Sequence, residues 1–394
     1  MDSHTWKAII LLLMLSGLDC VLSEVYHITP LPSDPCPMEH CFTLSQLAGN
    51  STNYLNTTNT TLVFLPGNHS LQSQIKFFAN VTTVSVLANS TLSTDSVIIL
   101  CGSDARFEFV GVNNVYMSGL KFVGCTGNRV ESVDQFTLED SSFVGQEDIN
   151  GTALELNETS ANLVQTSFNS NKGDKVHHVE CVDASRRRTK APAMAGGAIS
   201  VTRSKITIVQ SIFEENSAEM GGAIYSELNS NITIINSTFV GNHATSTASY
   251  RHCYVGGGGI LYDSGSTVIT IADTKFMDNS TSAQDDGGAV YLSNAINTTI
   301  TITDSEFTNI SAHYNGGAVY LFRANNTTVT IIDSEFINSS AQYFGGAVYF
   351  EDAINTTMTI TDSKFMDSSA QYSGGAVCMF GVTNTTIMIT SSEF

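Results

Sequence analysis

The chain has 394 residues, of which 42% are hydrophobic and 14% charged, with 17 Lys and Arg against 37 Asp and Glu. The apolar fraction is too high for a disordered acidic chain, and the acid excess argues against nucleic acid or an anionic membrane as a partner, because both require clustered cations. The commonest polar residues are Ser (46), Thr (44) and Asn (30), with 30 Gly. We therefore expect the sequence to say more about architecture than about a reaction.

Residues 1–23 have the features of a secretory signal peptide. Lys7 precedes an apolar run from Ala8 to Leu18, which is too short to span a bilayer, and cleavage is expected after about Ser23. No second apolar stretch of spanning length follows. We expect an extracellular or cell-surface protein with no transmembrane segment in this sequence.

Glycosylation sequons support a eukaryotic secretory route. Eighteen of the 30 asparagines begin N-x-[ST], against about seven expected by chance for N-x-[ST] triplets. Those in the C-terminal repeats are the predicted glycosylation sites: Asn297, Asn326, Asn355, Asn384, Asn309 and Asn338.

Seven cysteines remain after signal removal, and an oxidising compartment favours disulfides. Connectivity does not follow from sequence alone, but position in the cap, in adjacent coils and in the two insertions gives three candidate pairs. These are Cys36 with Cys41, Cys101 with Cys125, and Cys181 with Cys253. The second pair is 24 residues apart, about one repeat, which would place the two cysteines on adjacent coils.

The chain divides by its repeat content. Residues 24–60 lack the repeat and are predicted to form an N-terminal cap. Residues 61–195 form irregular coils with a loop insertion at 172–195, and a second loop is expected at 243–255. Residues 196–394 are regular coils, and the last of them ends in mid-repeat at Phe394.

The repeat itself has a period of 29 residues. NTTITITDSEF at 297–307 recurs as NTTVTIIDSEF at 326–336, NTTMTITDSKF at 355–365 and NTTIMITSSEF at 384–394. A second block, GGA[IV], begins at Gly196, Gly221, Gly287, Gly316, Gly345 and Gly374, with the variant GGGI at Gly257. Such a fixed period indicates a solenoid.

Alternation within each repeat predicts strands. Ile300 and Ile302 lie between threonines, and Val290 and Leu292 share a face in a second strand. No segment of the repeat has a helical pattern, and no proline occurs after Pro192 to interrupt a ladder. The predicted fold is an all-β, right-handed, single-stranded parallel β-helix of about 12 coils, because parallel crossovers are almost always right-handed.

GGA[ILV] followed by [ST]-x-F-x-x-N resembles the repeats of the chlamydial polymorphic outer-membrane proteins, within the pectin-lyase-like β-helix superfamily. Complete FxxN matches start at Phe213, Phe239 and Phe276, whereas in later coils Asn309 and Asn338 stand one position early. The resemblance implies a secreted or surface-displayed β-solenoid with an adhesive role.

Two tyrosine columns are the candidate binding residues. One consists of Tyr291, Tyr320 and Tyr349, and the other of Tyr314, Tyr343 and Tyr372. If the valines of the GGAV strand point inward, the first column faces outward as an aromatic ladder for a protein or sugar. The alternative is that both columns only cover neighbouring backbone.

Other polar groups have simpler explanations. The column Asp273, Asp304, Asp333 and Asp362 could chelate Ca²⁺, but turn formation is the preferred interpretation, and no cofactor is predicted. His177, His178, Glu180 and Cys181, with the basic run Arg186 to Lys190, have no specific metal-ligand spacing and are interpreted as a solvated loop.

The sequence thus predicts a non-enzymatic adhesion or scaffold protein whose partner is an unidentified extracellular protein or glycan. The alternative is a β-helix polysaccharide lyase or glycoside hydrolase, which would need a carboxylate pair in a cleft. Asp285 and Asp286 are the one adjacent pair that breaks the repeat, and no His or Arg accompanies them.

Overall fold

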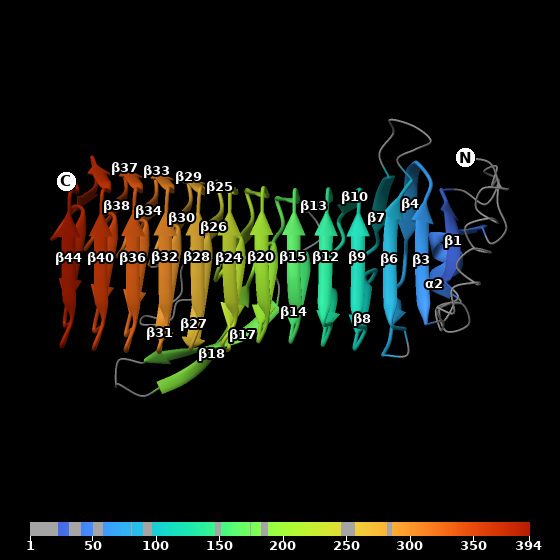
Figure 1. The fold of residues 1–394 in the computed structure, drawn as a ribbon, viewed down its shortest axis with the longest axis horizontal. Helices are drawn as coiled ribbons and strands as arrows, with labels where there is room; N and C mark the ends of the chain where they lie inside the picture. The colour runs from blue at the N-terminus through green and yellow to red at the C-terminus, as the bar shows by residue number, and fades with distance from the viewer. Residues whose placement is uncertain are drawn as a thin grey trace, which may run out of the picture.

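The structure is a computed structural model that describes residues 23–30, 41–49, 58–79, 81–89, 97–145, 151–173, 175–182, 188–245, 257–281 and 286–394. Strands stack in parallel along one axis to form a rod with three long sheets, here called A, B and C, and a short sheet E (Figure 1). The described helix is α2 (Leu44–Gly49).

Sheet A contains fourteen strands, in the order β2 (Cys41–Thr43), β1 (Ser23–Thr29), β3 (Asn59–Phe64), β6 (Thr83–Ala88), β9 (Asn114–Ser118), β12 (Gln135–Glu139), β15 (Ser160–Val164), β20 (Lys205–Val209), β24 (Asn231–Ile235), β28 (Val268–Ala272), β32 (Thr299–Thr303), β36 (Thr328–Ile332), β40 (Thr357–Thr361) and β44 (Thr386–Thr390). Sheet B contains β4 (Gly67–Leu71), β7 (Val97–Cys101), β10 (Leu120–Val123), β13 (Ser142–Val144), β16 (Ser167–Asn169), β21 (Ile212–Glu214), β25 (Thr238–Val240), β29 (Lys275–Met277), β33 (Glu306–Thr308), β37 (Glu335–Ile337) and β41 (Lys364–Met366).

Sheet C contains β5 (Ile75–Phe77), β8 (Phe107–Val110), β11 (Asn128–Glu131), β14 (Leu154–Asn157), β19 (Ile199–Thr202), β23 (Ile224–Glu227), β27 (Ile260–Gly265), β31 (Val290–Ala295), β35 (Val319–Phe322), β39 (Val348–Glu351) and β43 (Val377–Phe380). Sheet E contains β22 (Ser217–Ala218), β26 (His243–Ala244), β30 (Ser280–Thr281), β34 (Ser311–Ala312), β38 (Ser340–Ala341) and β42 (Ser369–Ala370).

The chain rises along the front in sheet A, passes over the top into sheet B and returns through sheet C while it advances from right to left (Figure 1). This sense of winding is right-handed, and every pairing within sheets A, B, C and E is parallel. The predicted right-handed parallel β-helix is therefore confirmed.

The core forms because strand alternation sends one side chain in two into the interior. In β32, Ile300 and Ile302 are fully buried while the threonines beside them face solvent. The buried phenylalanine of sheet B recurs in each coil, so that rings stack with centroids 4.5–5.2 Å apart from Phe122 to Phe394. Stacking buries apolar surface that a single coil would leave exposed.

A buried asparagine ladder closes the turn after sheet B. Asn242 donates through Nδ2 to the Phe213 carbonyl (2.9 Å) and to Asn279 Oδ1 (3.0 Å), and its own Oδ1 accepts from the Asn216 backbone N–H (3.1 Å) and Asn216 Nδ2 (3.0 Å). Asn171 begins this ladder. Beyond Asn279 the same position holds Ile310, Ser339 and Ser368, which explains why the FxxN motif ends there.

Left-handed residues form the corners. Asp273, Asp304, Asp333 and Asp362 have φ between 49° and 51° and follow the strands of sheet A. A side chain that hydrogen-bonds locally tolerates this conformation best. The Asp column is thus part of the corner, as the turn interpretation predicts.

The N-terminal segments and the first insertion join the rod differently. Strand β1 pairs in parallel with β3 and extends sheet A, while Leu44 and Leu47 of α2 are buried against the core. Within the predicted insertion, β17 (Lys175–Val182) and β18 (Arg188–Ala195) form an antiparallel hairpin below the coils (Figure 1). Among the described residues, no helix is long and apolar enough to span a membrane.

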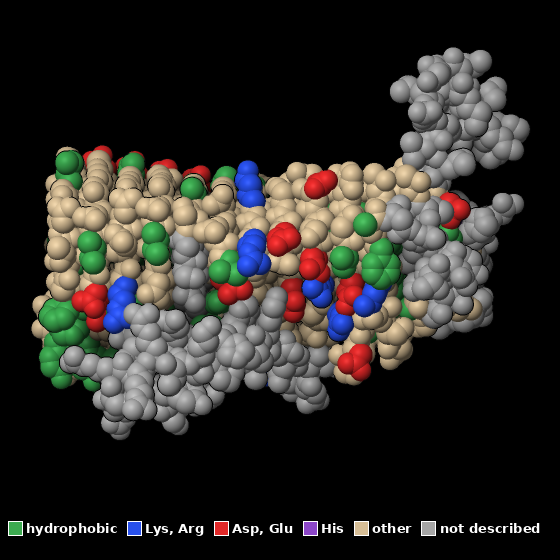
Figure 2. Space-filling view, turned by 90° about the horizontal axis from the view of Figure 1, so that it is seen from below, with side chains coloured by type: hydrophobic (Ala, Val, Ile, Leu, Met, Phe, Trp, Pro, Cys, Tyr) green, Lys and Arg blue, Asp and Glu red, His purple; other side chains and the backbone are tan. Residues whose placement is uncertain are grey.

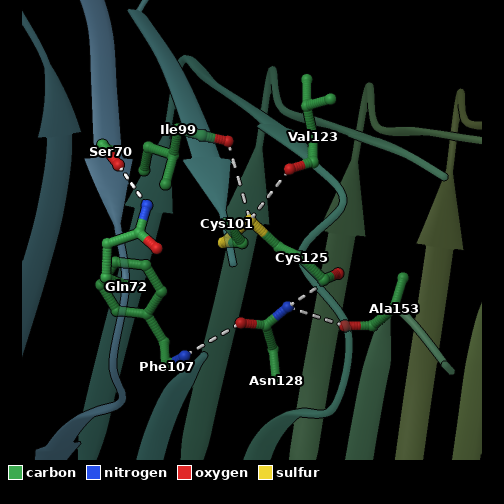
Figure 3. The surroundings of a disulfide bond; sticks show 9 residues. All are labelled: Ser70, Gln72, Ile99, Cys101, Phe107, Val123, Cys125, Asn128 and Ala153. Carbon is green, nitrogen blue, oxygen red and sulfur yellow. Dashed lines mark hydrogen bonds between the residues drawn. A yellow bond between two sulfur atoms is a disulfide. The ribbon is translucent and has the colours of Figure 1, made fainter. Parts of the chain in front are cut away.

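Of the predicted disulfides, Cys101–Cys125 is present, with a Cα–Cα distance of 5.0 Å (Figure 3). It links the end of β7 to the residue that follows β10 by two positions, and these strands pair on adjacent coils. Asn128 lies beside it and bridges the Phe107 N–H and the Ala153 carbonyl. Cys41 is also disulfide-bonded. Cys36, Cys253 and the side chain of Cys181 lie outside the described part of the chain, and Cys378 is a free thiol.

Candidate binding face

The inner tyrosine column is buried, so the prediction of an exposed ladder at Tyr291, Tyr320 and Tyr349 is wrong. The valines do point into the core, and the tyrosines point to the opposite side of sheet C, but each tyrosine is at most 1% exposed. Their rings stack at 5.0 and 5.2 Å and belong to a second apolar cluster with Phe322.

The glycine corner contributes to this burial. Gly316 has φ +64°, and a Cβ placed on it would stand 2.5 Å from the Tyr320 Cβ. The corner therefore folds directly over the tyrosine of its own coil. The sequence contained this signal, because a glycine pair lies four residues before each tyrosine, but the alternation of strands alone did not show what covers the outer face.

The outer tyrosine column remains accessible. Rings of Tyr314 and Tyr343 stack at 4.9 Å and those of Tyr343 and Tyr372 at 5.1 Å. Tyr314 and Tyr343 are half-buried. Phe344 contacts Tyr372 and Phe380. We call these five residues the aromatic patch, and Figure 2 shows hydrophobic side chains gathered at this end of the rod.

Carboxyl and phenol groups meet beneath the patch. The Tyr320 hydroxyl donates to Glu351 Oε2 over 2.7 Å, and the Tyr349 hydroxyl also bonds Glu351. Burial raises the pKa of Glu351, although the Tyr320 hydrogen bond opposes the rise. Burial likewise raises the pKa of Tyr320 and of Tyr349.

Of the carboxylate pair considered for catalysis, the structure describes Asp286. Asp286 is 7% exposed, and its Oδ1 accepts the Asn315 backbone N–H over 3.0 Å. Asp285 lies outside the described residues. Asp286 thus has a structural hydrogen bond at a coil corner beside the tyrosine cluster.

A band of ion pairs covers the outer face of sheet C in the N-terminal coils, where blue and red side chains alternate (Figure 2). Glu108 accepts from Lys76 Nζ (2.7 Å) and Arg106 Nε (2.6 Å), and Arg129 pairs with Glu131. Burial opposes ionisation of Glu108, but the two cations outweigh it and lower its pKa. Sequence reasoning missed this band because only the stacking of β5, β8 and β11 brings Lys76, Glu108 and Arg129 onto one face.

A groove along the turn from sheet C to sheet A was also missed. Its floor and walls span four coils and consist of Asn294, Ile296, Arg323, Ala324, Asn325, Asp352, Ile354, Gly381 and Thr383. These positions recur every 29 residues with different side chains, so no repeated motif marks them.

The sequon columns are exposed at coil corners. Asn326 Nδ2 donates to Asn297 Oδ1 and Asn384 Nδ2 to Asn355 Oδ1, each over 2.6 Å, and Asn338 Nδ2 donates to Asn309 Oδ1 over 2.8 Å. Neighbouring acceptor sites thus touch each other along the rod.

Within the described ranges, no group of three or more His, Cys, Asp or Glu side chains is arranged to hold a metal ion. The aspartate column has one carboxylate per coil at an exposed corner. The structure does not describe the side chains of the predicted loop residues, which are His177, His178, Glu180, Cys181 and the basic run.

Comparison with known proteins supports the repeat assignment. The model of the Chlamydia polymorphic membrane protein repeat matches residues 210–227 and 304–321, each of which runs from the sheet B strand of one coil through the glycine corner into its sheet C strand. No curated protein matches the chain.

Solved structures similar to this chain have diverse roles. A mannuronic acid-specific polysaccharide family 6 lyase from human gut microbiota is 10% identical, with 88% of this chain and 87% of that chain covered and a TM-score of 0.39. The periplasmic alginate epimerase AlgG is 8% identical (88% and 83% covered, TM-score 0.40). PfbA, a surface adhesin of Streptococcus pneumoniae, is 10% identical (89% and 85% covered, TM-score 0.38). Similarity at this level does not extend to chemistry.

Proposed function

We propose that this parallel β-helix with polymorphic membrane protein-type repeats is a secreted or cell-surface glycoprotein that acts in adhesion or as a scaffold, without catalysis. The observation that carries the proposal is the aromatic patch, where stacked rings of consecutive coils reach the surface. Aromatic faces bind both apolar protein surfaces and the C–H faces of sugars.

The repeat gives this contact its mechanism. Tyr314, Tyr343 and Tyr372 present the same group at intervals of about 5 Å along a rigid rod. A partner that is itself repetitive meets several weak sites at once, so its affinity rises through effective concentration rather than through one deep pocket.

The test is binding of the full secreted chain to glycan and protein arrays, presented as a monomer and on multivalent beads. Multivalent display should increase retention steeply on the true partner. The double variant Tyr343→Ala/Tyr372→Ala should abolish that increase, while Phe78→Ala, which removes an exposed ring near the N-terminal end of the rod, should leave it unchanged. Equal losses in both variants, or retention that does not depend on valency, would refute the proposal.

A second candidate function is polysaccharide cleavage. One observation favours it, because burial raises the pKa of Glu351, which is the direction that a carboxylic general acid requires. Against it, the phenols of Tyr320 and Tyr349 occupy this carboxyl group in a buried cluster. Turnover of a polysaccharide panel that is lost in Glu351→Gln or Asp286→Asn, with the fold intact, would establish the enzyme instead.

A further inference from the structure

The outward face of sheet A differs from the rest of the surface in charge. From β3 to β44 it has three outward positions on each of twelve strands. Of these, Glu139 and Lys205 carry charges and the others are neutral. The chain as a whole has a net charge of −20. We call this surface the threonine face, since threonine is its commonest residue.

The face is a regular array of hydroxyl and methyl groups. Thr270, Thr301, Thr330 and Thr359 are paired in register on consecutive strands, and Thr299, Thr328, Thr357 and Thr386 form a second column. Columns repeat at about 4.8 Å between strands and about 6.6 Å along each strand. Threonine is stiff at χ1, so the array is fixed before any contact is made.

The hydroxyls of the two columns form no hydrogen bond with any described residue, in contrast to the turn serines. Ser305, Ser334 and Ser363 donate to carbonyl groups of the corner over 2.7–2.8 Å. A hydroxyl both donates and accepts, so a hydroxyl array is complementary to a second copy of itself. The spacing of the hydroxyl groups is the same in both copies, so each strand of one face can meet a strand of the other.

We propose that the threonine face binds the threonine face of a second copy of this chain. Two copies that each carry −20 repel least where the surface is neutral. Twelve strands at about 4.8 Å and five residues at about 3.3 Å give a face of about 950 Å². This area is comparable with the roughly 800 Å² per partner of a stable interface. The inference does not depend on the adhesion proposal, which uses sheet C and its corner.

The edges of the face select one orientation. The aspartate corners with Asp304 border one edge, and the corner asparagines with Asn297 border the other. A two-fold axis along the rod places each Asp column opposite the partner's Asn column, with coils at equal height. An axis along the strands would instead oppose Asp to Asp. The two rods therefore lie side by side and point the same way.

Sedimentation of the full secreted chain tests the interface. It is measured before and after enzymatic removal of N-glycans, because Asn59 and Asn231 are sequons within the face. Wild type should show a concentration-dependent dimer, strengthened by salt that screens the net charge. The variant T301K/T330K/T359K brings like charges together and should raise the dissociation constant at least about tenfold.

The matched control is T308K/I337K/M366K, which adds the same three charges to sheet B on the same coils. It should leave the dimer intact. The proposed dimer is refuted if wild type sediments as a monomer at all soluble concentrations in both glycan states, or if the two triple variants dissociate equally. A dimer that forms only after deglycosylation supports binding through the threonine face.

Cross-linking tests the orientation. In a Cys378→Ser background, Thr330→Cys should be joined to the partner's equivalent thiol by a reagent of about 10 Å, the separation of packed sheets. Ile337→Cys, on sheet B of the same coil, should give no dimer. Cross-linking of Ile337→Cys but not Thr330→Cys would overturn the arrangement.

Discussion

Asparagine has opposite environments at adjacent positions of the turn after sheet B. Asn242 is fully buried and bonds both neighbouring coils, whereas Asn338 is exposed and left-handed, one position earlier in its own repeat. Asn242 stands three positions after the phenylalanine of its coil, whereas Asn338 stands two positions after. Only an asparagine at the third position reaches a carbonyl group of the preceding coil.

Replacing Asn242 by Ala should lower the free energy of unfolding by about 3 kcal/mol, because it leaves several buried donors and acceptors without partners. The measurement is chemical denaturation followed by circular dichroism. Asn338→Ala is the control and should lower the free energy of unfolding by only about 1 kcal/mol, the cost of placing alanine in a left-handed backbone. Similar effects of the two substitutions would contradict the ladder's importance.

Glu351 links pH to stability. Its folded-state pKa is raised from the ordinary 4.5, so the folded chain holds this proton more tightly than the unfolded chain does. The contribution is fully present below pH 4.5 and is lost as pH rises through the raised value. Wild type should therefore lose stability relative to Glu351→Gln as pH increases from acidic to neutral.

Denaturation of both proteins across this pH range measures the difference directly. Glu335→Gln controls for the loss of one negative charge, since Glu335 is a half-exposed partner of Lys364. A stability difference that does not vary with pH would show that the buried cluster does not retain the proton.

At the scale of elements, the glycine corner joins sheet E to sheet C and covers the inner tyrosines. Gly316 needs a left-handed backbone, and Gly317 has no room for a side chain because a Cβ would lie 1.9 Å from the Gly346 carbonyl oxygen. The constraint on Gly316 comes from Tyr320 of its own coil, and the constraint on Gly317 comes from the coil that follows. The GG pair is therefore a packing requirement between coils as well as a turn.

Gly316→Ala should destabilise the fold by about 2 to 5 kcal/mol, the sum of the cost of a left-handed L-residue and of overpacking against Tyr320. It should also expose the tyrosine column, which tyrosine fluorescence and nitration can report. Gln342→Ala, at an exposed position of the corresponding corner in the next coil, should have little effect. If Gly316→Ala matched this control, the corner would not cover the tyrosines.

At the scale of the whole molecule, one rod presents faces of different chemistry. Sheet A is neutral and rich in threonine, the outer face of sheet C changes from ion pairs to aromatic side chains along the rod, and the corners carry columns of Asp and Asn. Because each column repeats at the spacing of the coils, a group attached to one coil, such as a glycan, competes for space with the same group on the neighbouring coils.

Glycan mapping tests this crowding. Asn279 is a sequon with a buried side chain in the ladder, so the folded secreted protein should carry no glycan there. Along Asn297, Asn326, Asn355 and Asn384, where side chains of neighbours touch, we expect fewer than four glycans per molecule. Intact-glycopeptide mass spectrometry that finds Asn279 modified, or all four corner sites fully occupied, would contradict the geometry.

The repeat determined the coil by itself, because a period of 29 residues with alternating Thr and Ile leaves only parallel stacking to bury Ile300, Ile302 and Phe307. The Cys101–Cys125 disulfide followed from a separation of 24 residues, about one coil, which brings the two cysteines to adjacent coils.

Which side of a strand reaches solvent was decided only by tertiary structure. Alternation placed Tyr320 opposite Val319 but could not show that the corner at Gly316 and a second apolar cluster cover it. The ion pairs of Glu108, the groove beside Arg323 and the neutrality of sheet A likewise depend on which coils and corners become neighbours, and that information is distributed over the whole chain.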